Sequence, residues 1–105
     1  MPSTAENTPF PETIEVFGLK WDAETRGEEL AVYRPSPLGA DSSQVISIYR
    51  GKNRWFVPPY RFNAHCHQDR PGGVSVLRST RRPHERLADA LRDLETSQSV
   101  RVRGL

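Results

Sequence analysis

Basic and aromatic side chains alternate between residues 49 and 62. The segment holds the cations Arg50, Lys52, Arg54 and Arg61 and the rings of Tyr49, Trp55, Phe56, Tyr60 and Phe62. Guanidinium and ammonium groups neutralise phosphates, and flat rings stack on exposed bases. This combination indicates a nucleic-acid contact in which Trp55 stacks on bases or wedges between them. The same rings are also typical of a sheet core covered by arginine stems, so a purely structural role is the competing interpretation.

A second group of cations precedes a predicted helix. Arg81 and Arg82 follow Ser79 and Thr80, either of which could cap the helix by accepting an unpaired backbone N–H. A helix N-terminus carries a partial positive charge, so two added arginines favour an anion there. That anion is a phosphate or a partner's carboxylate, and arginines that only face water are the alternative. The predicted nucleic-acid contacts are therefore Arg50, Lys52, Arg54, Trp55, Arg61, Arg81 and Arg82.

The run His65-Cys66-His67 has the side-chain types of a metal site, with Asp69 close by. On an extended strand the two histidines would point to one side and Cys66 to the other. A closed zinc site needs four ligands, which these residues do not supply. Cys66 with neighbouring histidines also has the composition of a nucleophile and base, but sequence neighbours on a strand point apart. We find no glycine-rich phosphate loop or nucleophile elbow, and we expect no enzyme activity, metal or cofactor. Metal binding by the two histidines stays open at this point.

Charge is divided unevenly along the chain. Residues 1–44 carry eight acids and three bases, a net charge of −5, and residues 45–105 carry five acids and twelve bases, a net charge of +7. Such asymmetry suggests an anionic partner for the basic half, either nucleic acid or an acidic protein surface. The alternative is that the two halves neutralise each other within one fold.

Length and composition restrict the class of protein. Leu, Ile, Val and Phe make up 23 of the 105 residues, just above the level at which chains stay disordered. The single Cys66 cannot form an internal disulfide, which argues against a secreted, disulfide-stapled domain. No apolar run approaches the roughly 18 residues of a membrane span. We therefore expect no membrane association and a cytoplasmic location. The ratio of thirteen Arg to two Lys is typical of a GC-rich genome and suggests a bacterial or phage protein.

The pattern of residues predicts one domain with flanking segments. Residues 1–12 are rich in proline and polar residues and predict a disordered leader. Residues 13–97 form the domain, and residues 98–105 form a tail or a short edge strand. Self-assembly through this tail, which alternates over residues 100–103, is a third functional possibility.

Within the domain, short strands precede a helix. Strands are predicted at 13–21 (with a bulge near Phe17 and Gly18), 30–34, 44–50 and 74–77, and 54–57 is expected to pair with 44–50 across a turn. Residues 60–73 lack a clear period and predict a long loop, with one extended piece inside it as the alternative. The stripe of Leu87, Leu91 and Leu94, with Ala88 and Ala90 beside it, predicts a helix on the sheet. This helix is expected to run from a cap at Ser79 or Thr80 to about residues 95–97, with Asp93 on its outer surface. The fold class is therefore α+β, with a small antiparallel sheet of four or five short strands and one C-terminal amphipathic helix on one face.

The order of hairpin, strand and capped helix resembles the amino-terminal arm-binding domains of tyrosine integrases. The similar stretch is 44–95, and it rests on Arg54-Trp55 and on Ser79-Thr80 followed by the helix. The long loop 60–73 and the two strands before residue 44 depart from that pattern. The resemblance implies a three-stranded sheet that is laid into DNA.

These observations favour a small binding protein without enzyme activity. DNA binding through the basic and aromatic hairpin and the arginine-rich helix N-terminus is the first hypothesis. The alternative is an adaptor or inhibitor that binds a protein through the same Arg, Trp and Tyr surface, since these residue types dominate protein interfaces.

Overall fold

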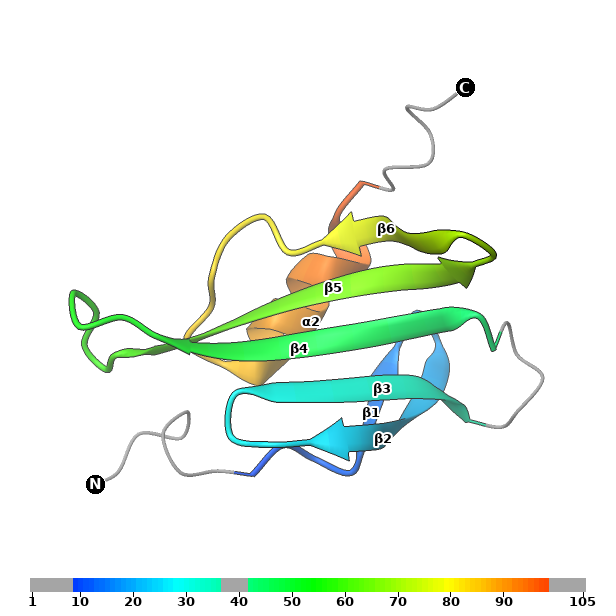
Figure 1. Ribbon diagram of the computed structural model, residues 1–105. Helices are drawn as coiled ribbons and strands as arrows, with labels where there is room; N and C mark the ends of the chain where they lie inside the picture. The colour runs from blue at the N-terminus through cyan, green and yellow to red at the C-terminus, as the bar shows by residue number, and fades with distance from the viewer. Residues whose placement is uncertain (1–8, 37–41, 99–105) are drawn as a thin grey trace.

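Six antiparallel strands and one helix make up the part of the chain that the computed structural model describes, residues 9–36 and 42–98. The elements are β1 (Thr13–Val16), β2 (Leu19–Arg26), β3 (Leu30–Ser36), β4 (Gln44–Lys52), β5 (Tyr60–Arg70), β6 (Gly73–Ser79) and α2 (Leu87–Thr96). Each strand pairs with its neighbour in sequence, in the order β1-β2-β3-β4-β5-β6 (Figure 1). The predicted α+β class is confirmed, although the sheet has six strands and not four or five.

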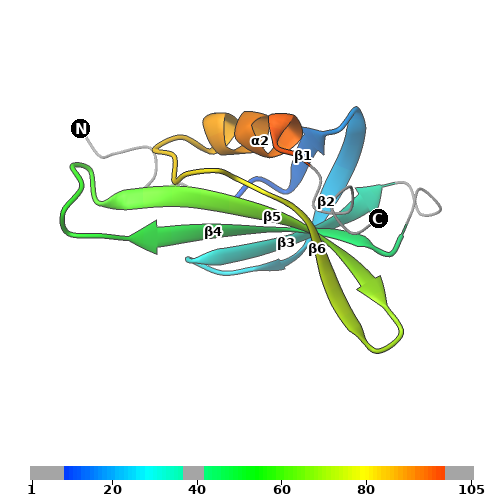
Figure 2. The same cartoon turned by 90° about the horizontal axis from the view of Figure 1, so that it is seen from above.

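The sheet is curled, and α2 covers one face of it, as predicted. Figure 2 shows the helix on the same side of the sheet as β1, and it packs against β5 and β1. Alternation along the strands divides the two faces, because successive side chains point to opposite sides. In β3, for example, Ala31, Tyr33 and Pro35 are buried, while the residues between them are partly exposed. We call the helix-covered face the inner face and the other the outer face.

The segment predicted as one bulged strand is a two-residue hairpin. Phe17 and Gly18 have φ angles of 56° and 70°, which is the pattern of a type I′ turn. The turn pairs Val16 with Leu19 and Ile14 with Trp21. All four side chains thus lie on one face, the result that the predicted bulge was expected to produce.

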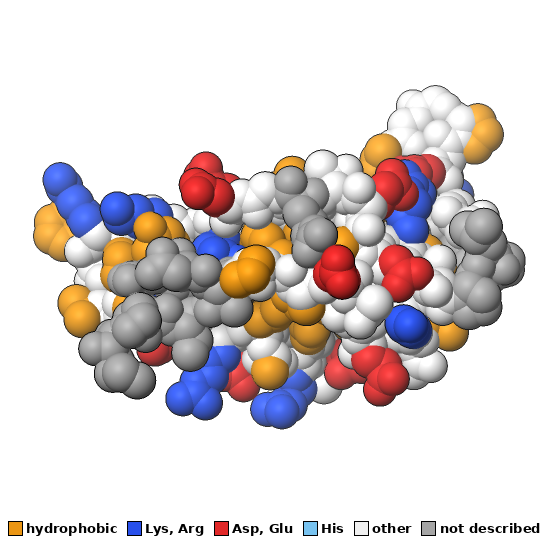
Figure 3. Space-filling view, turned by 90° about the horizontal axis from the view of Figure 1, so that it is seen from below, with side chains coloured by type: hydrophobic (Ala, Val, Ile, Leu, Met, Phe, Trp, Pro, Cys, Tyr) orange, Lys and Arg blue, Asp and Glu red, His pale blue; other side chains and the backbone are white. Residues whose placement is uncertain are grey.

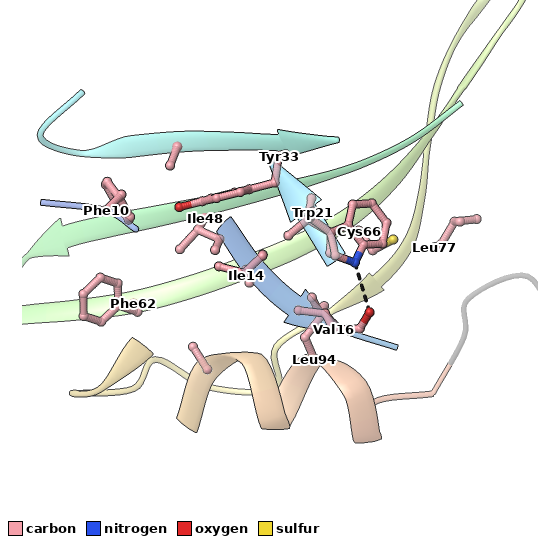
Figure 4. Close-up of a cluster of buried hydrophobic side chains, with 14 residues drawn as sticks. Phe10, Ile14, Val16, Trp21, Tyr33, Ile48, Phe62, Cys66, Leu77 and Leu94 are labelled. Atoms are coloured by element: carbon pink, nitrogen blue, oxygen red, sulfur yellow. Dashed lines mark hydrogen bonds between the residues drawn. The ribbon is translucent and has the colours of Figure 1, made fainter. Parts of the chain in front are cut away.

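The core lies between the inner face and α2. Figure 4 shows its aromatic members, among them Trp21, whose Nε1–H donates to the Val16 carbonyl oxygen at 3.0 Å. Tyr33 is also fully buried, and its hydroxyl donates to the Pro11 carbonyl oxygen at 2.6 Å. Phe10 is buried in the same cluster, so residues 9–12, assigned from sequence to the leader, include part of this core. Residues 1–8 and 99–105, which contain the rest of the leader and most of the tail, lie outside the described residues.

Two predictions for the β4–β5 region are wrong. Residues 54–57 are not a strand, and the predicted loop 60–73 contains β5, the longest strand of the sheet. Pro58 and Pro59 lack the N–H that a ladder requires, so pairing resumes only after them. The alternation in β5 was weak in sequence because its buried positions include the small residues Ala64 and Cys66.

The helix begins later than predicted. Its N-cap is Arg86, and Ser79 belongs to β6. The two predicted caps serve the sheet: Ser79 Oγ lies 2.8 Å from His65 Nδ1, and Thr80 Oγ1 accepts from the Ala64 amide at 3.3 Å. The leucine stripe of the helix is confirmed, with Leu94 buried and Leu87 and Leu91 packed against the core. Of the two alanines expected beside it, Ala90 is buried and Ala88 is exposed.

Asp93 is buried and does not lie on the outer surface of the helix as predicted. Its side chain is 6% exposed and accepts three hydrogen bonds from the β6–α2 connection. These come from the Arg81 amide at 2.9 Å, Arg81 Nε at 2.7 Å and His84 Nε2 at 2.7 Å. A buried carboxylate requires such partners, and here they fix the connection to the helix.

These hydrogen bonds control the pKa of Asp93. Burial acts to raise the pKa of this carboxyl, but the bonds from His84 and Arg81 outweigh burial and lower the pKa from 3.8 to about 2. A carboxyl whose pKa is lower in the folded chain than in the unfolded chain stabilises the fold when it is ionised. Its contribution is complete above pH ~4 and is lost as the pH falls toward 2.

We expect Asp93→Asn to lower the free energy of unfolding by about 2 kcal/mol at neutral pH. Urea unfolding of both proteins at pH 7, 4 and 2 measures the effect. The difference between them should shrink from pH 4 to pH 2, because the parent loses the ionised carboxylate there. A difference that stays constant over this range would contradict the role assigned to Asp93.

Candidate nucleic-acid interface

The connection between β4 and β5 projects from one end of the sheet (Figure 1). We call residues 52–61 the hairpin tip. Asn53 organises it: its amide donates to the Pro59 carbonyl oxygen at 2.8 Å, and its own carbonyl oxygen accepts from the Phe56 amide at 3.1 Å. The Asn53 side chain also accepts from the Trp55 amide at 2.9 Å. The backbone of the tip is therefore held in a defined turn, and the side chains extend from it.

Three cations of the tip each lie over an aromatic ring. The pairs are Lys52 over Tyr60, Arg54 over Trp55 and Arg61 over Phe56, at 5.8, 5.1 and 4.3 Å from the cationic group to the ring centroid. Arg61 Nη1 also donates to the carbonyl oxygens of Pro58 and Tyr60 at 2.6 and 2.7 Å. Cation–π contact orients each charge while leaving it unneutralised.

The tip is exposed and rich in positive charge. Trp55 is 79% exposed and Val57 is 91% exposed. Residues 44–68 contain four Lys and Arg and no Asp or Glu. Among the described residues, no carboxylate forms an ion pair with Lys52, Arg54 or Arg61. Figure 3 shows basic side chains beside hydrophobic ones at this end of the molecule. Of the predicted contacts, Lys52, Arg54, Trp55 and Arg61 are therefore brought together here.

Arg50 was predicted as a contact, but it lies in the interior. It is 7% exposed, and its guanidinium carbon lies 4.5 Å from the Phe10 ring centroid and 5.5 Å from that of Phe62. Alternation along β4 explains this, since Arg50 follows Ile46 and Ile48 on the inner face. Burial lowers the pKa of Arg50, opposed by the charges of Tyr60 and Glu28. We remove Arg50 from the interface.

The structure does not place Arg81 and Arg82 at a helix N-terminus. Both lie in the β6–α2 connection, and Thr80 beside them pairs with Ala64 within β5, away from the tip. Besides Asp93, Arg81 binds Thr96 Oγ1 at 2.6 Å. The two arginines line an open hollow of about 630 Å³. Arg81 is committed to holding the helix, and Arg82 is exposed.

The histidines lie on the outer face, and Cys66 is buried on the inner face. The ring centroids of His65 and His67 are 5.9 Å apart, and Tyr49 lies 5.5 Å from His65. Burial, with a smaller effect of His67, lowers the pKa of His65. In the described part of the chain, no three His, Cys, Asp or Glu residues are grouped to hold a metal. The two histidines thus share one side of the strand and Cys66 lies on the other, as expected for an extended segment. Sequence reasoning missed Tyr49, which the β4–β5 register places beside His65.

Comparisons with known proteins add no assignment. No family model matches the chain, and neither the curated proteins nor the solved structures give a match. The order of hairpin, strand and helix behind the resemblance to integrase arm-binding domains is present, with Arg54-Trp55 in the turn. Ser79-Thr80 does not cap α2, however, and the sheet has six strands and not three. The described helix is too short and too polar to cross a membrane. The function is therefore inferred from the geometry of the hairpin tip.

The two tryptophans lie in opposite environments, so their substitutions test whether Trp55 is exposed at the tip. Trp21 is 0% exposed and Trp55 is 79% exposed. We expect Trp55→Phe to shift the emission to shorter wavelength and to remove most of the quenching by acrylamide. The free energy of unfolding of this variant should differ from that of the parent by less than about 0.5 kcal/mol, because the Trp55 side chain packs on few other side chains. The matched variant Trp21→Phe should cost about 2 kcal/mol or more. Equal destabilisation by the two substitutions would contradict this placement.

Proposed function

We propose that this protein binds nucleic acid through the hairpin tip, with unpaired bases as the preferred target. Lys52, Arg54 and Arg61 contact phosphates, and Trp55 stacks on a base. The observation that carries the proposal is the indole of Trp55, which is 79% exposed and has the Arg54 guanidinium on one face. An indole has two faces, and the second one is free to stack on a base.

The charge around the tip supports an anionic partner. The β4–β5 hairpin lacks acidic residues from 44 to 68. The carboxylate of β5, Asp69, lies near the other end of that strand, so an approaching phosphate meets no carboxylate of these two strands at the tip. Nucleic acid releases counterions when cations neutralise its phosphates, and this release drives binding at low salt. Lys52, Arg54 and Arg61 could each neutralise one phosphate.

The shape of the tip supports unpaired bases over a duplex groove. A flat two-stranded ribbon could enter the major groove, but pairing between β4 and β5 ends at Lys52 and Tyr60. Beyond this pair the chain forms a proline-containing loop. Ring stacking on single strands is tolerant of sequence, which suits a site with one exposed indole.

Docking on an acidic protein surface is the second candidate. Val57 is 91% exposed and has no part in phosphate binding. Trp and Arg dominate the energetics of protein interfaces, and Val57 adds exposed apolar area beside them. This candidate uses the same residues of the tip, so the experiment must distinguish nucleic-acid binding from docking on a protein.

Fluorescence anisotropy with labelled oligothymidine tests the proposal, with the same strand paired to oligoadenosine as the comparison. We expect tighter binding to the single strand. The logarithm of its affinity should fall with the logarithm of salt concentration with a slope of about −2, for three phosphates on a single strand. The double variant Arg54→Ala, Trp55→Ala should weaken binding by about tenfold or more, through loss of stacking and of one charge.

The control removes similar groups from the opposite end of the sheet. Arg70 and Val74 flank the β5–β6 turn, and both are exposed. The variant Arg70→Ala, Val74→Ala should bind as the parent does. If neither nucleic acid binds at low salt, or if both double variants lose the same affinity, the proposal fails and the protein-docking candidate replaces it.

A further inference from the structure

A cavity of about 430 Å³ lies at the end of the core where α2 begins. Among the described residues, two phenylalanines, two prolines and one leucine form its apolar walls, and two arginines also line it. Phe10 and Phe62 lie at this end of the core (Figure 4), with ring centroids 6.1 Å apart in an edge-to-face arrangement. Cavities of this size and apolar character are typical of sites for small organic molecules.

The charged residues that the structure describes in the lining of the cavity are both cationic, and the carboxylate of Glu28 acts on Arg50 from outside that lining. Arg50 brings a guanidinium that is nine-tenths buried and lies over the rings of Phe10 and Phe62. Arg86, the N-cap of α2, adds a second guanidinium. None of the described residues that line the cavity is acidic. A guanidinium stays protonated at physiological pH and has five N–H donors, so it can serve several acceptors at once.

We infer that this cavity binds a small organic monocarboxylate, with the carboxylate at Arg50 and Arg86 and an apolar chain or ring against Phe10, Phe62 and Leu87. Carboxylates match the planar fork of a guanidinium with two parallel hydrogen bonds. Removal from water strengthens that contact. The apolar walls select for a ligand with a hydrophobic body, which a phosphate ion or acetate lacks. This inference is independent of nucleic-acid binding at the tip.

The test is a titration of the full ¹⁵N-labelled chain with sodium octanoate, followed by two-dimensional NMR. We expect saturable shifts of the Phe10, Phe62 and Leu87 amides and of the Arg50 side-chain N–H. The Kd should lie between about 1 μM and 1 mM, the range expected for a ligand of this size. Octylammonium has the same chain and the opposite charge, and acetate has the charge without the chain. Neither should saturate at these residues.

Two variants separate the charge from the packing. Arg50→Met keeps the stem and removes the guanidinium, and it should weaken octanoate binding by at least tenfold. Because this residue packs in the core, a dispersed NMR spectrum must first show that the variant folds. Arg86→Gln changes an exposed residue and should weaken binding about threefold, whereas Arg82→Gln, outside the cavity, should not change it.

Several outcomes would overturn the inference. One is octylammonium binding as tightly as octanoate, and another is shifts confined to the hairpin tip or the outer face. Unchanged affinity in both Arg50→Met and Arg86→Gln would also overturn it. The variant Trp55→Ala should bind octanoate normally, so loss of nucleic-acid binding and loss of carboxylate binding are measured separately.

Discussion

Side-chain alternation along β4 and β5 is the constraint on which the rest of the structure depends. Register pairs Arg50 with Phe62 and Ile48 with Ala64, and each such pair must point to the same face. The inner pairs build the core and the cavity, and the outer pairs place Tyr49 and the two histidines together. Where pairing ends, this constraint is lifted, and the tip residues can extend away from the sheet.

Arginine serves two physical roles in this hairpin. Arg50 lies over two buried rings, where water is excluded and a charge is costly unless it is compensated. Arg54 and Arg61 also lie over rings, but at the exposed tip, where water still solvates the charge. The same cation–π contact thus stabilises a buried cation in the core and orients accessible cations at the tip. Sequence spacing alone does not separate the two cases, because both have aromatic neighbours.

The sequence predicted the elements that have a strong local signal. The α+β class, the apolar stripe of α2 and the position of β4 follow from periodicity. Prediction from sequence failed where contacts between distant segments determine the position of a strand or a side chain. In β5, small and polar residues hid the alternation. The Asp93 side chain is buried because it binds Arg81 and His84, which lie outside its own helix. At the candidate site, Lys52, Arg54, Trp55 and Arg61 lie together, whereas Arg50 lies in the interior because it shares the inner face of β4 with Ile46 and Ile48.

The strictly sequential strand order has a consequence for how the chain assembles. Each strand meets a neighbour that is close in sequence, so every pairing closes a short loop at small entropic cost. The helix is the exception: it packs on β1, and the Phe17 amide donates to the Glu95 carboxylate across 78 positions. The meander can therefore grow by successive local steps, and helix docking then joins the last described element to the first strand.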